Sequence, residues 1–188
     1  MEVELSDLIA LSHTAAAAET YRTFVPTDAQ LRVLADTGRD VLLHFPVMPA
    51  ACAMMSAFYA ARLQTNTHAP VYVVAGALSI GTTCLFGKDA DARDWRSAFS
   101  ESNPSWDGHC WVMFGNLIAD ISIFRTAYPQ YTPPPLARYV AERFGRGRGL
   151  LIGTAAETGK LGFHYKPQYV LTEGQITALI SGARPFFL

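Results

Sequence analysis

The pattern of apolar and polar positions predicts helices at both ends of the chain and strands between them. Residues 3–20 carry apolar residues at helical spacing and then an alanine run, and a Thr-x-x-Gln capping box at Thr27 predicts a second helix that stops near Gly38. Residues 50–64 are small or apolar almost all round, which predicts a central buried helix. Residues 71–80 are rich in β-branched and aromatic side chains and predict a buried strand.

The second half of the chain completes an α+β pattern. Residues 88–104 are polar and predict a surface excursion, either irregular or with one short helix. Residues 132–145 predict an amphipathic helix and residues 150–170 one or two strands, and another Thr-x-x-Gln box at Thr172 predicts a last helix. This order favours an α+β fold in a single domain over residues 1–188.

Residues 109–123 predict a β-hairpin with a two-residue turn at Gly115-Asn116. Side chains alternate between the two faces of such a hairpin, and one face is wholly apolar and should enter the core. The other face collects the polar residues: His109, Trp111, Met113, Ile118, Asp120 and Ser122. His109 and Asp120 become diagonal neighbours about 7–8 Å apart along the backbone, so we expect their side chains to meet.

A carboxylate beside a histidine fixes the tautomer of the imidazole and stabilises the imidazolium. Cys52 lies early in the predicted buried helix, where the helix N-terminus and a nearby imidazolium both favour the thiolate. The sequence therefore predicts Cys52 as nucleophile, His109 as base and Asp120 as the residue that orients His109. Trp111 is expected to shield the His–Asp pair from water, and Ser122 either adds a hydrogen bond or fills the strand.

These segments together resemble the transglutaminase-like branch of the papain-like cysteine proteinase fold, including a small group of uncharacterised bacterial proteins placed in it. The resemblance covers roughly residues 45–125 and rests on Cys52 in PAACAMMSAFYAA, His109 in GHCWV and Asp120 in IADIS. It implies a central buried helix packed on an antiparallel sheet, and a Cys-His-Asp catalytic triad.

The chain departs from papain-type endopeptidases around the nucleophile. Pro46 stands near the place of the glutamine that completes the oxyanion hole in that family, and Ala53 stands where a tryptophan follows the nucleophile. The second oxyanion donor is therefore left open among Trp106, Asn103 and His44.

The residues and the resemblance together predict a thiol-dependent acyl-transfer enzyme. Cys52 would attack an amide, ester or thioester carbonyl of a small molecule or peptide. Water as acceptor gives a peptidase-type or amidase-type hydrolase, and an amine as acceptor gives an acyltransferase. A non-catalytic module that binds a peptide or small molecule on the same fold is the alternative. No cofactor is expected.

The remaining candidate residues have plainer interpretations. Cys110 falls on the apolar face of the hairpin and is expected in the core, while Cys84 is expected to be structural. A metal site of Cys84, His109 and Cys110 is disfavoured because no Cys-x-x-Cys or His-x-x-x-His spacing occurs. GRGRG at 145–149, with Arg143, lacks the Lys-Ser/Thr of a P-loop and is expected to be a solvated loop.

Composition and charge limit which classes of partner and which cellular location are expected. The chain has 188 residues, half of them hydrophobic, and a net charge of −1, which disfavours disorder and nucleic-acid binding. The long uncharged stretches 41–61 and 63–87 are interrupted by prolines or glycines, which disfavours a membrane span. An acidic start and three scattered cysteines favour the cytoplasm. The sequence makes no prediction of oligomeric state.

Overall fold

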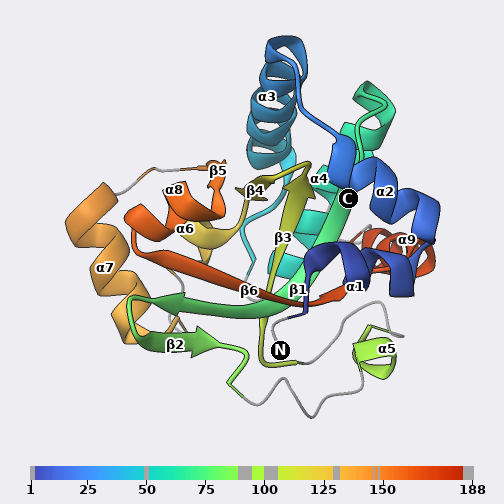
Figure 1. Cartoon of the computed structure of the whole chain (residues 1–188). Coiled ribbons are helices and arrows are strands. Elements are labelled where there is room, and N and C mark those ends of the chain that lie inside the picture. Colours follow the sequence, from blue (N-terminus) through green and yellow to red (C-terminus); the bar gives the residue numbers. More distant parts are fainter. Residues whose placement is uncertain are drawn as a thin grey trace.

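A computed structural model of the chain describes residues 3–48, 51–88, 95–99, 106–128, 132–145, 147 and 149–183. It is an α+β structure with helices around an antiparallel sheet (Figure 1). The helices are α1 (Leu5–Ser12), α2 (Ala15–Thr23), α3 (Asp28–His44), α4 (Cys52–Asn66), α5 (Trp95–Ala98), α6 (Ile123–Thr126), α7 (Pro134–Phe144), α8 (Ala155–Lys160) and α9 (Glu173–Ala183). The strands are β1 (Val71–Ile80), β2 (Thr83–Phe86), β3 (His109–Phe114), β4 (Leu117–Asp120), β5 (Leu151–Thr154) and β6 (Phe163–Val170).

Strand β1 organises the sheet and determines where β3 begins. It pairs with β3 over residues 71–76, with β2 over residues 78–80 and with β6 over residues 74–80. Because a residue has one partner on each edge of a strand, β3 and β2 share one edge of β1 and β6 follows the other. His109 pairs with Gly76 at the last position before β2 replaces β3 beside β1.

The register of the β3–β4 hairpin is the predicted one. Phe114 pairs with Leu117 across the Gly115-Asn116 turn, and the pairing continues to Val112 and Ala119. Gly115 has a φ of +56°, which a residue without a Cβ adopts at little cost. The apolar face enters the core as expected, and the face that carries His109 is buried as well.

Two groups of helices cover the two faces of the sheet. Helix α4 packs on β1 and β3, together with α3 and α9, and most of its side chains are buried, as the sequence predicts. Helix α1 crosses the opposite face over β6 (Figure 1), where Leu8 and Ile9 pack against Trp111 and Met113. The face of the hairpin that bears His109 is buried because α1 and the Tyr165 side chain pack on it.

Two helix boundaries differ from the prediction. Residues 3–20 are not one helix, because Thr14 caps a new helix by accepting a hydrogen bond from the Ala17 amide. The helix that starts at the Thr27 capping box does not stop at Gly38 but continues to His44. Gly38 instead marks close packing, since a Cβ there would approach a Leu150 side-chain carbon to 2.6 Å.

The other predicted elements are present. The amphipathic helix is α7, the segment 150–170 holds β5 and β6 with α8 between them, and Thr172 caps α9 through Gln175. Of the polar segment 88–104, the structure describes residue 88 and residues 95–99, which include α5.

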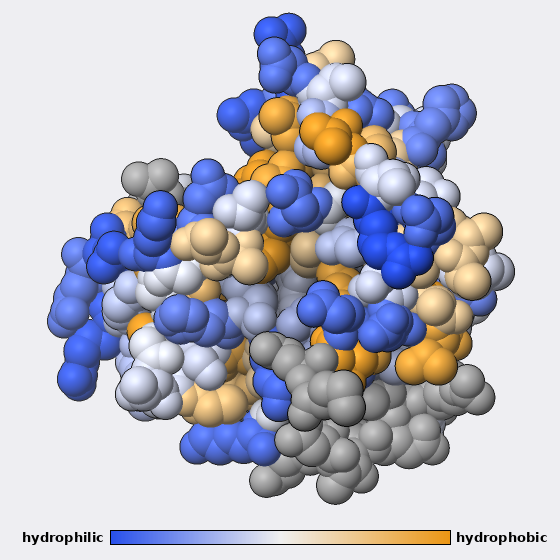
Figure 2. Space-filling model, viewed as in Figure 1, coloured by the Kyte–Doolittle hydropathy of each residue, from blue (hydrophilic) through white to orange (hydrophobic). Residues whose placement is uncertain are grey.

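The outer surface is mixed in polarity. Figure 2 shows hydrophilic residues over much of the viewed face and hydrophobic residues in separate patches. Within the described ranges, every helix is too short or too polar to cross a membrane.

Candidate functional site

His109 and Asp120 form a buried pair where β3 and β4 separate. His109 Nε2 lies 2.6 Å from Asp120 Oδ2, and the two side chains are 1% and 0% exposed. The β3–β4 pairing ends at Val112 and Ala119, so beyond that point the strands leave room for the two side chains to meet diagonally.

Five hydrogen bonds hold the Asp120 carboxylate. Oδ1 accepts from the Ser122 amide at 2.9 Å, the Ser122 hydroxyl at 3.1 Å and the Ile123 amide at 2.9 Å. Oδ2 accepts from His109 and from the Tyr165 hydroxyl at 2.8 Å. The pairing of β4 with β3 ends at Ala119 and the chain turns into α6 at Ser122, which binds Asp120 through its amide and hydroxyl.

Aromatic rings surround His109. The Phe86 ring stacks on the imidazole at 5.6 Å between centroids, and the Trp111 ring lies nearly parallel to it at 6.5 Å. Trp111 is fully buried, as expected of a residue that shields the pair from water, and Tyr165 packs edge-on against it. Phe86 and Tyr165 come from β2 and β6, which the sequence did not connect to the site.

Cys52 completes the arrangement from the opposite side of the sheet. It is the first residue of α4 and is half-buried. Its sulfur lies close enough to the His109 side chain and to Cys110 for both residues to lower the Cys52 pKa. Because Nε2 of His109 binds Asp120, Nδ1 is the ring nitrogen left for the sulfur.

The surroundings favour a thiolate at Cys52. The hydrogen bond from the Cys110 side chain lowers the Cys52 pKa, burial raises it, and the hydrogen bond and positive charge of His109 lower it further. The result is a Cys52 pKa well below its ordinary value. The N-cap residue Ala51 has no side-chain oxygen to compete for the first amides of the helix, whose dipole also favours negative charge.

The same contacts favour an imidazolium at His109. Burial alone lowers the His109 pKa, but the charge and hydrogen bond of Asp120, aided by the Cys52 sulfur, outweigh burial and raise the pKa to about 10. Burial likewise opposes ionisation of Asp120, but the charge of His109 and the surrounding donors lower its pKa. All three pKa shifts favour the charged forms of Cys52, His109 and Asp120.

As the pH rises, the raised His109 pKa lowers the free energy of unfolding, whereas the lowered Cys52 pKa raises it. An unfolded histidine loses its proton near pH 6.5, so the stabilisation from His109 is complete below that pH and is lost as the pH rises through about 10. An unfolded cysteine loses its proton near pH 9.0, so the stabilisation from the Cys52 thiolate is complete above that pH and is lost as the pH falls through the lower folded pKa.

We expect the pH dependences of these two contributions to oppose each other over the range below pH 9.0 and to separate above it. Above that range only His109 still changes its proton binding, so the free energy of unfolding should fall by roughly 0.5 kcal/mol per pH unit. Urea unfolding at several pH values measures this as the difference between the wild type and a C52S/H109A variant, in which neither group titrates. A difference that rises steadily with alkaline pH would contradict the assigned charges.

Tyr165 is expected to stabilise the Asp120 carboxylate. Burial and the nearby Asp120 charge raise the Tyr165 pKa well above its usual value, so its hydroxyl remains a donor. Tyr165→Phe should lower the free energy of unfolding by roughly 1.5 kcal/mol, because a hydrogen bond to a charged group is lost. Tyr128→Phe is the matched control, since its hydroxyl donates to the exposed Gly145 carbonyl, and it should change stability by less than about 0.5 kcal/mol. Equal effects in chemical denaturation would count against this role of Tyr165.

Other predicted residues lie away from the Cys52–His109–Asp120 line. His44 is exposed at the end of α3 and contacts Asp40, and Trp106 is half-buried with its ring 5.0 Å edge-on to Phe99. Asn103 lies outside the described residues. Arg125 does not pair with Asp120, because it donates to the Phe45 and Leu42 carbonyls at the end of α3.

The remaining cysteines and the GRGRG segment have the following contacts. Cys110 is buried in the core, and the Cys84 sulfur donates to the Phe86 carbonyl. Arg143 donates to the Lys160 carbonyl, and Arg146 and Arg148 of GRGRG lie outside the described residues. Among the described side chains, no group of three or more His, Cys, Asp or Glu is arranged to hold a metal ion.

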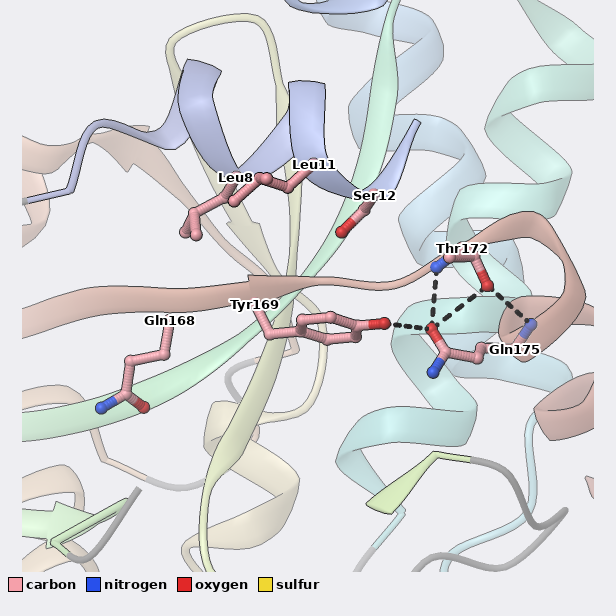
Figure 3. A pocket seen from close by; sticks show the side chains of 7 residues that line it. All are labelled: Leu8, Leu11, Ser12, Gln168, Tyr169, Thr172 and Gln175. Atoms are coloured by element: carbon pink, nitrogen blue, oxygen red, sulfur yellow. Dashed lines mark hydrogen bonds between the residues drawn. The ribbon is translucent and has the colours of Figure 1, made fainter. Parts of the chain in front are cut away.

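A separate pocket of about 500 Å³ lies between α1, the end of β6 and the start of α9 (Figure 3). Its lining consists of Leu8, Leu11, Ser12, Gln168, Tyr169, Thr172 and Gln175. Figure 3 shows Gln175 Oε1 engaged by Thr172 and by the Tyr169 hydroxyl, so this oxygen serves the cap of α9. The pocket includes none of the residues that form the Cys52–His109–Asp120 line.

The Cys52–His109–Asp120 line has the order of groups that nucleophilic catalysis needs. A sulfur at a helix N-terminus faces an imidazole, and a carboxylate fixes the other side of that imidazole. Comparison of the chain with protein-family models, with curated proteins and with solved structures gives no match.

Proposed function

We propose that the protein is a thiol-dependent acyl-transfer enzyme of the papain-like, transglutaminase-like kind. The observation that carries this proposal is the buried contact between His109 and Asp120, with Cys52 close enough to the same imidazole for each to shift the pKa of the other. A buried histidine with only a structural role can satisfy its two ring nitrogens with any donor or acceptor. Here its two ring nitrogens join an acid that orients it to a thiol that it can activate.

In the proposed reaction, the Cys52 thiolate attacks the carbonyl carbon of an amide, ester or thioester. A carbon–sulfur bond forms, and the carbonyl oxygen takes the negative charge, which the first amides of α4 can stabilise. The His109 imidazolium gives its proton to the leaving group as the carbon–heteroatom bond breaks, and an acyl-enzyme remains. Neutral His109 then takes a proton from water or an amine, which attacks the thioester and releases Cys52.

Asp120 acts on His109 alone in this scheme. With five donors around it, the carboxylate stays ionised and supports the imidazolium without taking its proton. The choice between water and an amine as acceptor depends on what reaches the acyl-enzyme, so a hydrolase and an acyltransferase share these first steps.

Acyl labelling followed by mass spectrometry tests the proposal. The native protein is treated with a small activated ester, an acyl thioester and an activated amide, and the modified residue is located by peptide mapping. We expect a single acyl group on Cys52 that is lost with time by hydrolysis, or on adding an amine. His109→Ala should carry no such group. Cys84→Ser is the control, because Cys84 lies outside the line and should not alter labelling. Labelling spread equally over Cys52 and Cys84, or none on Cys52, would favour a binding module.

A further inference from the structure

Cys52 has a second cysteine as its immediate neighbour. Cys110 follows His109 in β3, and its side chain points to the opposite face of the strand, toward α4. Cys52 packs against the buried cluster that contains Cys110, where α4 contacts β3, and Cys110 is the neighbour with the largest effect on the Cys52 pKa. Both thiols are free, and Cys52 is half-buried whereas Cys110 is buried.

The local packing fixes the two cysteines relative to each other. Ser56, one helical turn after Cys52, donates its hydroxyl hydrogen bond to the Cys110 carbonyl at 3.1 Å. This bond holds the first turns of α4 against β3 at Cys110. Cys84 is on β2, and its sulfur is engaged with the Phe86 carbonyl.

We propose that Cys52 and Cys110 form a site of reversible oxidation by hydroperoxides, in which Cys52 is oxidised first and Cys110 then closes a Cys52–Cys110 disulfide. The inference rests on the proposed role of Cys52 as a nucleophile, and it adds regulation of that site. The disulfide occupies the nucleophilic sulfur, so the oxidised protein has no thiolate for acyl transfer.

The proposed reaction has two balanced steps. The Cys52 thiolate attacks one oxygen of the hydroperoxide, the O–O bond breaks, and the departing alkoxide or hydroxide takes a proton to leave as an alcohol or water. This produces a sulfenic acid on Cys52. The Cys110 sulfur then attacks the Cys52 sulfur, and the hydroxyl leaves with the Cys110 proton as water. Two thiols are oxidised and one hydroperoxide is reduced.

The charges around the pair fit this order of events. Burial and contact with Cys52, including its negative charge, raise the Cys110 pKa, so Cys110 stays protonated while Cys52 is a thiolate. The exposed part of Cys52 gives a peroxide access to the more reactive sulfur. A neutral sulfenic acid on Cys52 no longer opposes ionisation of Cys110, so the first oxidation prepares the second step.

The test follows the mass of the native protein after brief treatment with hydrogen peroxide. We expect the wild type and the Cys84→Ser control to lose the mass of two hydrogen atoms, with a Cys52–Cys110 link in the peptide map. Alkylation of Cys52 by iodoacetamide should fall by roughly tenfold or more and return after dithiothreitol. Cys110→Ser and Cys110→Ala should instead gain one oxygen on Cys52, trapped by dimedone, and then a second oxygen.

The outcomes separate this inference from the proposed function. A wild-type protein that is alkylated readily at Cys52 but gains oxygen without forming the link would overturn the inference and leave the acyl-transfer proposal intact. A link that involves Cys84 would also overturn it. A Cys52 that reacts with neither iodoacetamide nor peroxide would overturn both.

Discussion

Replacing His109 by alanine should lower the rate at which iodoacetamide alkylates Cys52 at about pH 6 by roughly tenfold or more, because the thiolate fraction falls when the pKa rises toward its ordinary value. In the wild type, the hydrogen bond and positive charge of His109 help to hold the Cys52 pKa well below that value. Without the imidazole, burial opposes ionisation of the thiol, and the bonds from Cys110 remain as partial compensation.

The measurement is the second-order alkylation rate across a pH series, with the modified residue located by mass spectrometry. His44→Ala is the matched control, because His44 is exposed on α3 and contacts only its own helix among the bonds described. The control should react as the wild type does. A His109→Ala rate within about threefold of the wild type would show that Cys52 does not depend on the imidazole.

Asp120→Asn should cost about 3–5 kcal/mol of stability, the usual effect of removing one member of a buried charged pair. Donors face both carboxylate oxygens, three at Oδ1 and two at Oδ2. An amide has one accepting oxygen and one NH₂ group, so either orientation sets donor against donor. His109 also loses the charge that chiefly opposes the effect of burial on its pKa.

Urea unfolding of Asp120→Asn measures this cost, with Asp107→Asn as the control because Asp107 is exposed just before β3. The control should stay within about 0.5 kcal/mol of the wild type. The same Asp120 variant should also show slower alkylation of Cys52 near neutral pH, since a His109 with a lower pKa spends less time as imidazolium. A stability loss below about 1 kcal/mol would mean that the pair is not the buried charged unit described.

The sequence could predict the parts of the site that local chemistry controls. The Gly115-Asn116 turn determines the hairpin register, and that register alone places His109 and Asp120 on one face. The run of small apolar residues after Ala51 predicts the buried helix that begins at Cys52.

Contacts between distant segments could not be predicted in the same way. Tyr165 reaches Asp120 from β6, and Phe86 stacks on His109 from β2. Strand periodicity indicates which face of the sheet a residue occupies, but it does not indicate which strand is the neighbour. The pairing of β6 with β1 over residues 74–80 therefore had no sequence signal.

At Gly38 and Ser122 the local structure differs from the one that the sequence pattern predicts, because of contacts with other residues. Glycine is a residue type that often ends a helix, but Gly38 lies inside α3. Its lack of a side chain allows Leu150 and Tyr59 to pack closely against the helix there. Ser122 follows strand alternation in the sequence, but its amide and hydroxyl bind Asp120 and turn the chain into α6. In both places a side-chain contact outweighs the local pattern.

The protonation state of His109 shows whether the imidazole and the Cys52 sulfur form a charged pair. Nitrogen NMR of histidine-labelled protein, with His109 assigned by the signal that His109→Ala lacks, follows the imidazole across the pH range. The account predicts a doubly protonated ring through neutral pH, with a midpoint near 10 that falls in Cys52→Ser, because one of the groups that raise it is removed. A His109 that titrates near the ordinary value of 6.5, unaffected by Cys52→Ser, would contradict the thiolate–imidazolium pair.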